Sequence, residues 1–175
     1  YQATEPENLI KFIDEKKRRL QEIIPNLIKK QGKQTTYKVH IYEGQKGLRT
    51  IHEDILKELK KDEEFVIIGA PKKAHDKLEP FFLDFHKRRQ KIGIRLRCIY
   101  NQDAAQYAEV RRKMKKTQIK YMPQDVSAPS WTTVYNSKTI ILVVGDIVLG
   151  IVIENNIISE NFKTYFELLW KLAKK

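Results

Sequence analysis

The stretch WTTVYNSKTIILVVGDIVLGIVIE, from Trp131 to Glu154, decides the fold of this chain. It holds three runs rich in Val, Ile, Thr and Tyr, residues that favour a pleated sheet surface. Asn136-Ser137 and Gly145-Asp146 separate the runs, and the leading glycine of the second pair predicts a two-residue hairpin with a type II′ turn. Residues 140–144 and 147–153 are apolar on both faces, which predicts interior strands that helices must cover.

Strand and helix patterns alternate before this stretch. Strand patterns occupy residues 36–42, 65–68, 94–100 and 118–122, and helical patterns occupy 45–61, 75–91 and 104–116. A last helix follows Ser159, its expected N-cap. Alternation predicts parallel strands joined by right-handed crossovers, with three antiparallel strands added by the final block. The sequence therefore predicts an α/β fold with a mixed, mostly parallel sheet and helices on both faces.

Residues 1–33 carry a different pattern, which separates them from residues 34–175. Apolar side chains recur at the 3.5-residue spacing of a coiled-coil seam: Leu9, Ile13, Leu20, Ile23 and Leu27. We interpret this segment as a helical, coiled-coil-like linker that pairs with a partner chain. The alternative is an ordinary helix packed on its own domain.

The composition narrows the class of protein. The net charge of +12 attracts polyanions and favours a nucleic-acid partner, although lysines on helix exteriors explain it equally well. The basic runs 16–19, 87–91 and 111–116 fall inside helical patterns and lack interleaved aromatic residues. No apolar run approaches the roughly 18–20 residues of a membrane span, so no membrane partner is expected. The single cysteine, Cys98, lies in an apolar strand pattern, which predicts a buried, inert thiol and a cytoplasmic protein.

Motifs for catalysis are missing from the sequence. No glycine-rich phosphate loop is present, and the four histidines do not form a metal-ligand pattern, so neither cofactor nor metal is predicted. His52 is expected to be solvated.

An α/β sheet of this order is typical of the phospholipase D superfamily, whose signature is H-x-K-x-x-x-x-D with histidine as the nucleophile. His75-Asp-Lys77 begins that signature, but Phe82 stands at the aspartate position. If Asn136 takes the aspartate position, Pro129 and Trp131 take those of histidine and lysine. The sequence therefore predicts no enzymatic activity.

Four segments together resemble the C-terminal region of archaeal TrmB-like transcription regulators: VHIYEGQKGLRTIHEDILKELK, EFVIIGAP, FFLDFHKRRQKIGIRLRCIYN and YFELLWKLAKK. The opening ATEPENLIKFIDEKKRRLQEIIPNL resembles the helical linker of these proteins. The resemblance implies that residues 34–175 are a phospholipase D-like domain without catalytic residues, which senses an effector and dimerises.

The same resemblance implies three partners: a second copy of the chain, a small-molecule effector and DNA. The family's winged helix would bind the DNA and should precede Tyr1, so we interpret the chain as a fragment. The alternative function is that of a divergent phosphodiesterase or nuclease of the phospholipase D superfamily.

Ligands of such sheets sit beyond the carboxyl ends of the parallel strands. We expect contacts from six residues near that rim: Glu43, Arg49, Tyr100, Asn101, Trp131 and Tyr135. Glu43 is expected to orient hydroxyl groups or to pair with Arg49. Core packing is the alternative for Tyr100 and Trp131. Anion candidates are His86, Arg88 and Arg89, with a solvated helix face as the favoured alternative for the two arginines.

Overall fold

The computed structural model describes residues 6–30, 37–124 and 126–174, with side chains in the first range described for residues 10 and 12–24. The chain divides into two compact units, Tyr1–Thr36 and Tyr37–Lys175. The first unit contains the helix α1 (Pro6–Lys30). Thr36, the predicted start of the first strand, lies outside the described residues. No described helix is long and apolar enough to cross a membrane.

The second unit alternates strands and helices before ending in a β-meander and a helix. Its strands are β1 (Lys38–Glu43), β2 (Glu64–Ala70), β3 (Arg95–Tyr100), β4 (Thr117–Tyr121), β5 (Ser130–Tyr135), β6 (Lys138–Val144) and β7 (Val148–Glu154). Its helices are α2 (Gly44–Glu58), α3 (Lys72–Ile92), the short 3₁₀ helix η1 (Gln102–Ala104), α4 (Ala105–Arg112) and α5 (Asn156–Leu172).

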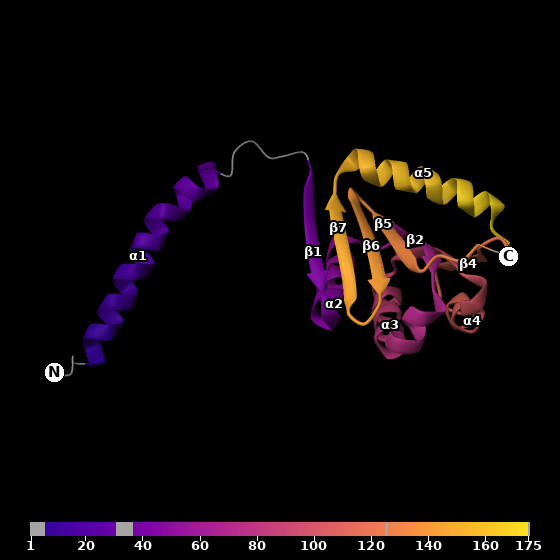
Figure 1. Cartoon of the computed structure of the whole chain (residues 1–175), viewed down its shortest axis with the longest axis horizontal. Helices are drawn as coiled ribbons and strands as arrows, with labels where there is room; N and C mark the ends of the chain where they lie inside the picture. The colour runs from indigo at the N-terminus through magenta and orange to yellow at the C-terminus, as the bar shows by residue number, and fades with distance from the viewer. Residues whose placement is uncertain (1–5, 31–36, 125, 175) are drawn as a thin grey trace. The chain divides into compact units, whose positions relative to one another are not determined.

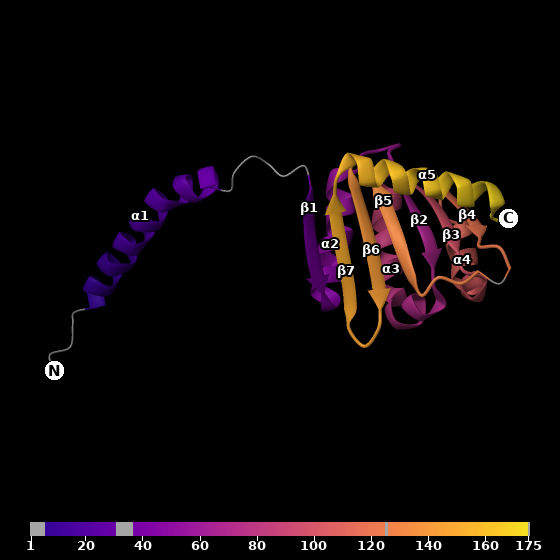
Figure 2. The same ribbon diagram turned by 45° about the horizontal axis from the view of Figure 1, so that its top comes forward.

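Within the described residues, seven strands form one sheet in the order β1-β7-β6-β5-β2-β3-β4, as Figure 2 shows. The predicted mixed sheet is confirmed, and β6 and β7 are interior strands. The prediction of a mostly parallel sheet is wrong, because among these strands only the pairs β2–β3 and β3–β4 are parallel.

The alternation of strands and helices predicted the direction of the strands correctly but did not predict which strands are neighbours in the sheet. Strands β1 to β4 all run in the same direction, as right-handed crossovers require. The meander β5–β7, however, is inserted between β1 and β2. β1 therefore pairs antiparallel with β7, from Lys38 opposite Glu154 to Glu43 opposite Leu149.

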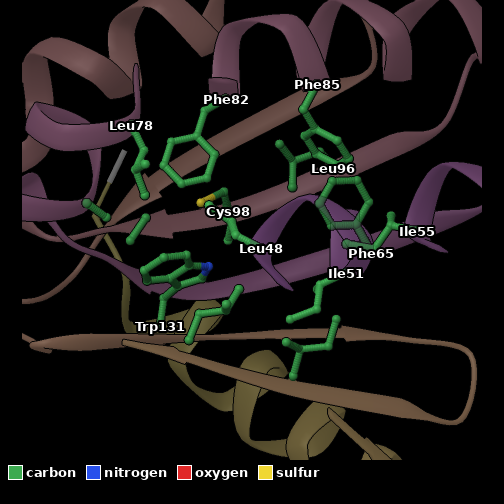
Figure 3. Close-up of a cluster of buried hydrophobic side chains, with 14 of the residues drawn as sticks. Leu48, Ile51, Ile55, Phe65, Leu78, Phe82, Phe85, Leu96, Cys98 and Trp131 are labelled. Atoms are coloured by element: carbon green, nitrogen blue, oxygen red, sulfur yellow. The ribbon is translucent and has the colours of Figure 1, made fainter. Parts of the chain in front are cut away.

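Helices cover both faces of the sheet, as predicted (Figure 1). Helices α2, α3 and α4 lie on one face and α5 crosses the other. The larger core lies under α2, α3 and α4, where Phe82, Phe85 and Trp131 are buried (Figure 3). A smaller core lies under α5 and centres on the fully buried Phe166.

Two local predictions about turns and caps are wrong. Strands β6 and β7 pair up to Val144 opposite Val148, so the connection has three residues, and Gly145 does not have a positive φ. The last helix is capped by Asn155, whose side chain accepts a 3.0 Å hydrogen bond from the Ile158 amide. Ser159 lies inside that helix and is buried.

Two fully buried arginines fix α3 and α4 on the sheet. Arg89 donates to the carbonyl of Ile94 at 2.5 Å and to Thr117 Oγ1 at 2.6 Å, which joins α3 to the starts of β3 and β4. Burial lowers the pKa of Arg89 to about 10, so its guanidinium stays charged at neutral pH. Arg111 makes a bidentate pair with Glu79, which joins α4 to α3.

The contact between α2 and β7 leaves no room for a side chain at position 150. A Cβ atom on Gly150 would lie 2.4 Å from Ile51 Cδ1 and 3.1 Å from Leu142 Cδ2, both in the packed core. We expect Gly150→Ala to lower the free energy of unfolding by roughly 1–3 kcal/mol, as overpacking does. The control is Gly145→Ala, whose Cβ would meet nothing closer than 3.7 Å. Chemical denaturation of both variants measures the difference, and equal stabilities would contradict the packing argument.

Candidate functional site

Three histidines from α2 and α3 surround a small cavity on the α2/α3 side of the sheet. His52, His75 and His86 line it together with Tyr100 and Trp131, and its volume is about 30 Å³. All three histidines are at most 6% exposed. The cavity has room for one or two water molecules and no larger ligand. We call it the histidine cavity.

Burial keeps these imidazoles neutral. It lowers the pKa of His52 to about 4, and the His52 Nδ1–H donates to the Leu48 carbonyl at 2.9 Å. Burial also lowers the pKa of His75 and, more strongly, that of His86. His86 Nδ1 is buried and has no hydrogen-bond partner within the described part of the chain. The prediction that His52 is solvated is wrong, because its ring packs against Phe81 and Phe85.

His75 belongs to a buried ion-pair cluster with Glu79 and Arg111. Its Nδ1–H donates to Glu79 Oε2 at 2.9 Å, and the same carboxylate accepts the bidentate bond from Arg111. Burial acts to raise the pKa of Glu79, but the hydrogen bonds from His75 and Arg111 outweigh it and lower that pKa. The His75 ring also stacks on Tyr100 and Tyr107, with ring centroids 5.4 and 4.9 Å apart. Each of these contacts holds His75 within the fold.

Other reactive groups are equally enclosed. Cys98 is fully buried as predicted, and burial raises the pKa of its thiol well above the ordinary value. No group of three His, Cys, Asp or Glu side chains among the described residues has the arrangement of a metal site.

The carboxyl ends of β2 and β3 are covered by the loop that leads into β5. Asn101 donates to the Ala128 carbonyl at 2.8 Å, and its Oδ1 accepts from the Ala128 amide at 3.3 Å. Gly69 has a φ of +78°, and a Cβ atom there would lie 2.8 Å from the Ala128 Cβ. The sequence predicted a ligand at this rim of the sheet. At Gly69 and Asn101, however, the loop before β5 fills the rim.

A larger, polar groove lies between α2 and the β1–β7–β6 part of the sheet. Its volume is about 320 Å³, within the range of small-molecule sites. Its polar lining is His40, Tyr42, Thr50, Glu53, Asp54, Lys57, Tyr135, Lys138 and Glu154. Lys138 bridges Asp54 and Glu58 at 2.5 Å each, and the Tyr135 hydroxyl donates to Asp54 at 2.8 Å. We call this hollow the α2 groove.

The structure brings together some of the predicted contact residues and scatters the rest. Tyr100, Trp131 and His86 line the histidine cavity, and Tyr135 lines the α2 groove. Both Tyr100 and Trp131 are core residues, 2% and 4% exposed. Glu43 and Arg49 are exposed, and no ion pair joins them in the described structure.

The two arginines suggested as anion contacts already have protein partners. Arg88 makes two 2.5 Å bonds to the Glu53 carboxylate. Arg89 is fully buried, so the expectation of a solvated helix face is wrong for it.

Sequence reasoning missed the cluster of His75, Glu79 and Arg111 and the burial of His52. A signal for α3 was present in the spacing, because His75 and His86 fall in the stripe of Leu78, Phe82 and Phe85 at three- and four-residue steps. Arg111 on α4, the partner of Glu79, has no such signal in its sequence spacing.

Comparisons with known proteins agree on the fold. No protein-family model matches the sequence, and no curated protein does either. Among solved structures, the chain is similar to TrmBL2, an archaeal chromatin protein whose structure shows a novel mode of DNA binding. That match has 13% identity and a TM-score of 0.54, and it covers 97% of this chain but only 66% of that chain.

Two further solved structures are similar as well. NucT from Helicobacter pylori matches at 11% identity and a TM-score of 0.53, over 79% of this chain and 98% of that chain. Nuc, a phospholipase D family member from Salmonella typhimurium, matches at 9% identity and a TM-score of 0.55, over 79% of this chain and 97% of that chain. At these identities the likeness shows the fold alone, which is phospholipase D-like.

The buried histidines predict that stability falls in mild acid. The pKa of His52 is about 4 in the folded chain against 6.5 ordinarily, so below pH 6.5 the unfolded chain binds a proton that the folded chain does not. Between about pH 7 and pH 5 this one group lowers the free energy of unfolding by about 2 kcal/mol. The lowered pKa values of His75 and His86 add in the same direction.

Urea denaturation at the two pH values measures this loss. The variant His52→Leu should show a smaller loss, whereas His40→Leu, at an exposed position, should not change it. A free energy of unfolding that stays constant between the two pH values would contradict the assignment.

Proposed function

We propose that this chain is the effector-binding and dimerisation part of a TrmB-like transcription regulator and that it has no phosphodiesterase activity. The proposal rests on which residues occupy the phospholipase D signature positions in and around β5, up to the turn residue Asn136. When Asn136 takes the aspartate position of the phospholipase D signature, the nucleophile position falls on Pro129 and the lysine position on Trp131. Proline has no nucleophilic atom, and the Trp131 indole is 4% exposed and packs against Phe82.

The remaining histidines do not supply a substitute nucleophile. His52, His75 and His86 are buried, and His75 is held by Glu79. His40 is exposed, but it lies on the edge strand β1, at the opposite margin of the sheet from β3 and β4. No pair of histidines from these positions presents itself to a phosphodiester.

The extent of the structural likeness favours a regulator over a nuclease. The matches to NucT and Nuc cover 79% of this chain, which is the share that the unit Tyr37–Lys175 makes up. The match to TrmBL2 covers 97% and so takes in most of the first unit as well. The seam positions Ile13, Leu20 and Ile23 of α1 are 49–63% exposed, as a helix awaiting a partner requires, whereas Leu9 and Leu27 lie outside the described side chains.

The α2 groove is the place where we expect the effector. Its polar lining combines hydroxyl and imidazole groups of His40, Tyr42 and Thr50, carboxylates of Glu53, Asp54 and Glu154, and the ammonium groups of Lys57 and Lys138. Carboxylates accept hydrogen bonds from hydroxyl groups and repel phosphates. Because three carboxylates stand against two ammonium groups, and Lys138 is already bound by Asp54 and Glu58, we expect a neutral, hydroxyl-rich ligand such as a sugar over an anionic one.

The absence of catalysis is tested with bis(p-nitrophenyl) phosphate, a generic phosphodiester. Release of nitrophenolate should not exceed that of protein-free buffer, because no nucleophile is in place. The matched variants are His75→Asn, His86→Asn and, as the exposed control, His40→Asn, each checked for folding by circular dichroism. Turnover that disappears in either buried-histidine variant and persists in the control would favour the nuclease alternative.

The effector site is tested by thermal shift with neutral mono- and disaccharides and with the corresponding sugar phosphates. A ligand at a hundred times its Kd stabilises the folded state by about 2.7 kcal/mol and raises the melting temperature by several degrees. Thr50→Arg should abolish the shift by filling the groove.

A matched control for the groove variant is Thr164→Arg on α5. Both threonines are exposed, and both donate to the carbonyl four residues earlier at 3.0 Å. A shift that survives Thr50→Arg, or that appears only with sugar phosphates, would contradict the groove assignment.

A further inference from the structure

Helix α5 covers only one end of the sheet face on which it lies, as Figures 1 and 2 show. The exposed fractions of residues that lie side by side across the strands show where α5 stops covering the sheet. Thr139 lies beneath α5 and is fully buried. In the next row Ile41, Ile151 and Ile141 stand side by side, and Ile41 is 66% exposed. In the row after that, Leu149 pairs with Val143, which is 36% exposed.

The helix itself turns an apolar side toward these uncovered rows. Lys163 donates to the Asn136 carbonyl and Glu167 pairs with Arg97, so the polar side of α5 points to the end of the sheet where β5 stops and β2 begins. Tyr165, Leu168 and Leu172 lie on the other side at three- and four-residue steps, and they are 50–61% exposed.

Sheet and helix together form one apolar surface, which we call the open face. Its members are Val39, Ile41, Ile141, Val143, Leu149, Ile151, Tyr165, Leu168 and Leu172. All of these side chains are apolar, and the exposed, charged Glu43, which stands opposite Leu149, lies at the margin of the surface. Contiguous exposed apolar surface of this kind marks an interaction site in a water-soluble domain.

We propose that the open face is the surface through which two copies of the unit Tyr37–Lys175 dimerise. This inference rests on the dimer in the proposed function and assigns it a second contact besides α1. Two chains that each carry +12 repel each other, and the residues of the open face contribute no lysine to that repulsion. An apolar surface is also complementary to itself, as a two-fold symmetric contact requires, whereas a patch of one charge is not.

Pairing of α1 makes a modest contact sufficient. Two domains joined by paired helices meet at an effective concentration in the millimolar range. The open face then holds the domains together even where it buries less than the roughly 800 Å² per partner of a free-standing interface.

The test uses the full chain and measures the dimer dissociation constant by sedimentation velocity over the micromolar range. The double variant Ile41→Asp with Leu168→Asp alters two side chains that are more than half exposed, so the fold should be retained. We expect the dimer to dissociate at least tenfold more readily than the unaltered chain. Tyr165→Glu is a second, single change on the same face with the same expected direction.

The matched control is Val110→Asp on α4, where an exposed valine lies on the opposite side of the sheet. It should leave the dissociation constant unchanged. A seam variant, Ile13→Glu with Leu20→Glu, weakens the contact through α1 separately, and combining it with the face variant should give a monomer.

The remaining outcomes distinguish the contact through α1 from the contact through the open face. Weakening by the seam variant alone overturns the open-face proposal and leaves dimerisation by α1 standing. A chain that is monomeric throughout overturns both. A monomer that binds vesicles of neutral phosphatidylcholine, with binding lost in the face variant, reassigns the open face to lipid and also overturns the proposal.

Discussion

The side of α3 that packs on the sheet carries polar groups as well as apolar ones, and the fold depends on each charge there having a partner. An unpaired buried charge destabilises a protein by several kcal/mol. Arg89 meets that constraint with the Ile94 carbonyl and Thr117, and the Glu79 carboxylate on α3 meets it with Arg111 of α4. These bonds are directional, unlike apolar contacts. They fix where α3 and α4 lie over β3 and β4, and the position of the histidine cavity follows from them.

The sequence predicted what depends on local pattern. The runs of β-branched residues located the meander, and the alternation of elements gave the common direction of β1 to β4. The pairing of β1 with β7 depends on a contact across nearly the whole domain, for which no local pattern exists. Residue type also misled: arginine is mostly exposed in proteins and histidine is intermediate, yet Arg89 and His52 are buried because their partners come from the fold. Among the predicted contact residues, Tyr100 and Trp131 line the histidine cavity, whereas Glu43 and Arg49 line neither it nor the α2 groove. Which side chains meet is decided by the fold and not by residue type.

Two parts of the sheet differ in the space that they offer a ligand. At the carboxyl ends of β2 and β3, the bonds of Asn101 and the close approach of Ala128 to Gly69 leave the chain packed against itself. The α2 groove, by contrast, keeps open space and a mixed polar lining. In the proposed function, the alignment that puts Pro129 at the nucleophile position goes together with a ligand site in the α2 groove, away from the carboxyl ends of β2 and β3.

The strand β1 has a consequence for how the chain reaches its structure during synthesis. It is the first strand of the domain to leave the ribosome, and its neighbour in the sheet, β7, is the last. The groups β2–β4 and β5–β7 each pair within a short stretch of sequence, so they can assemble early. β1 must wait, with Val39 and Ile41 unpaired, until translation of the domain is nearly complete, and such long-range pairing is slow. Throughout that interval the nascent chain presents an unpaired apolar strand, the kind of segment that pairs with other chains.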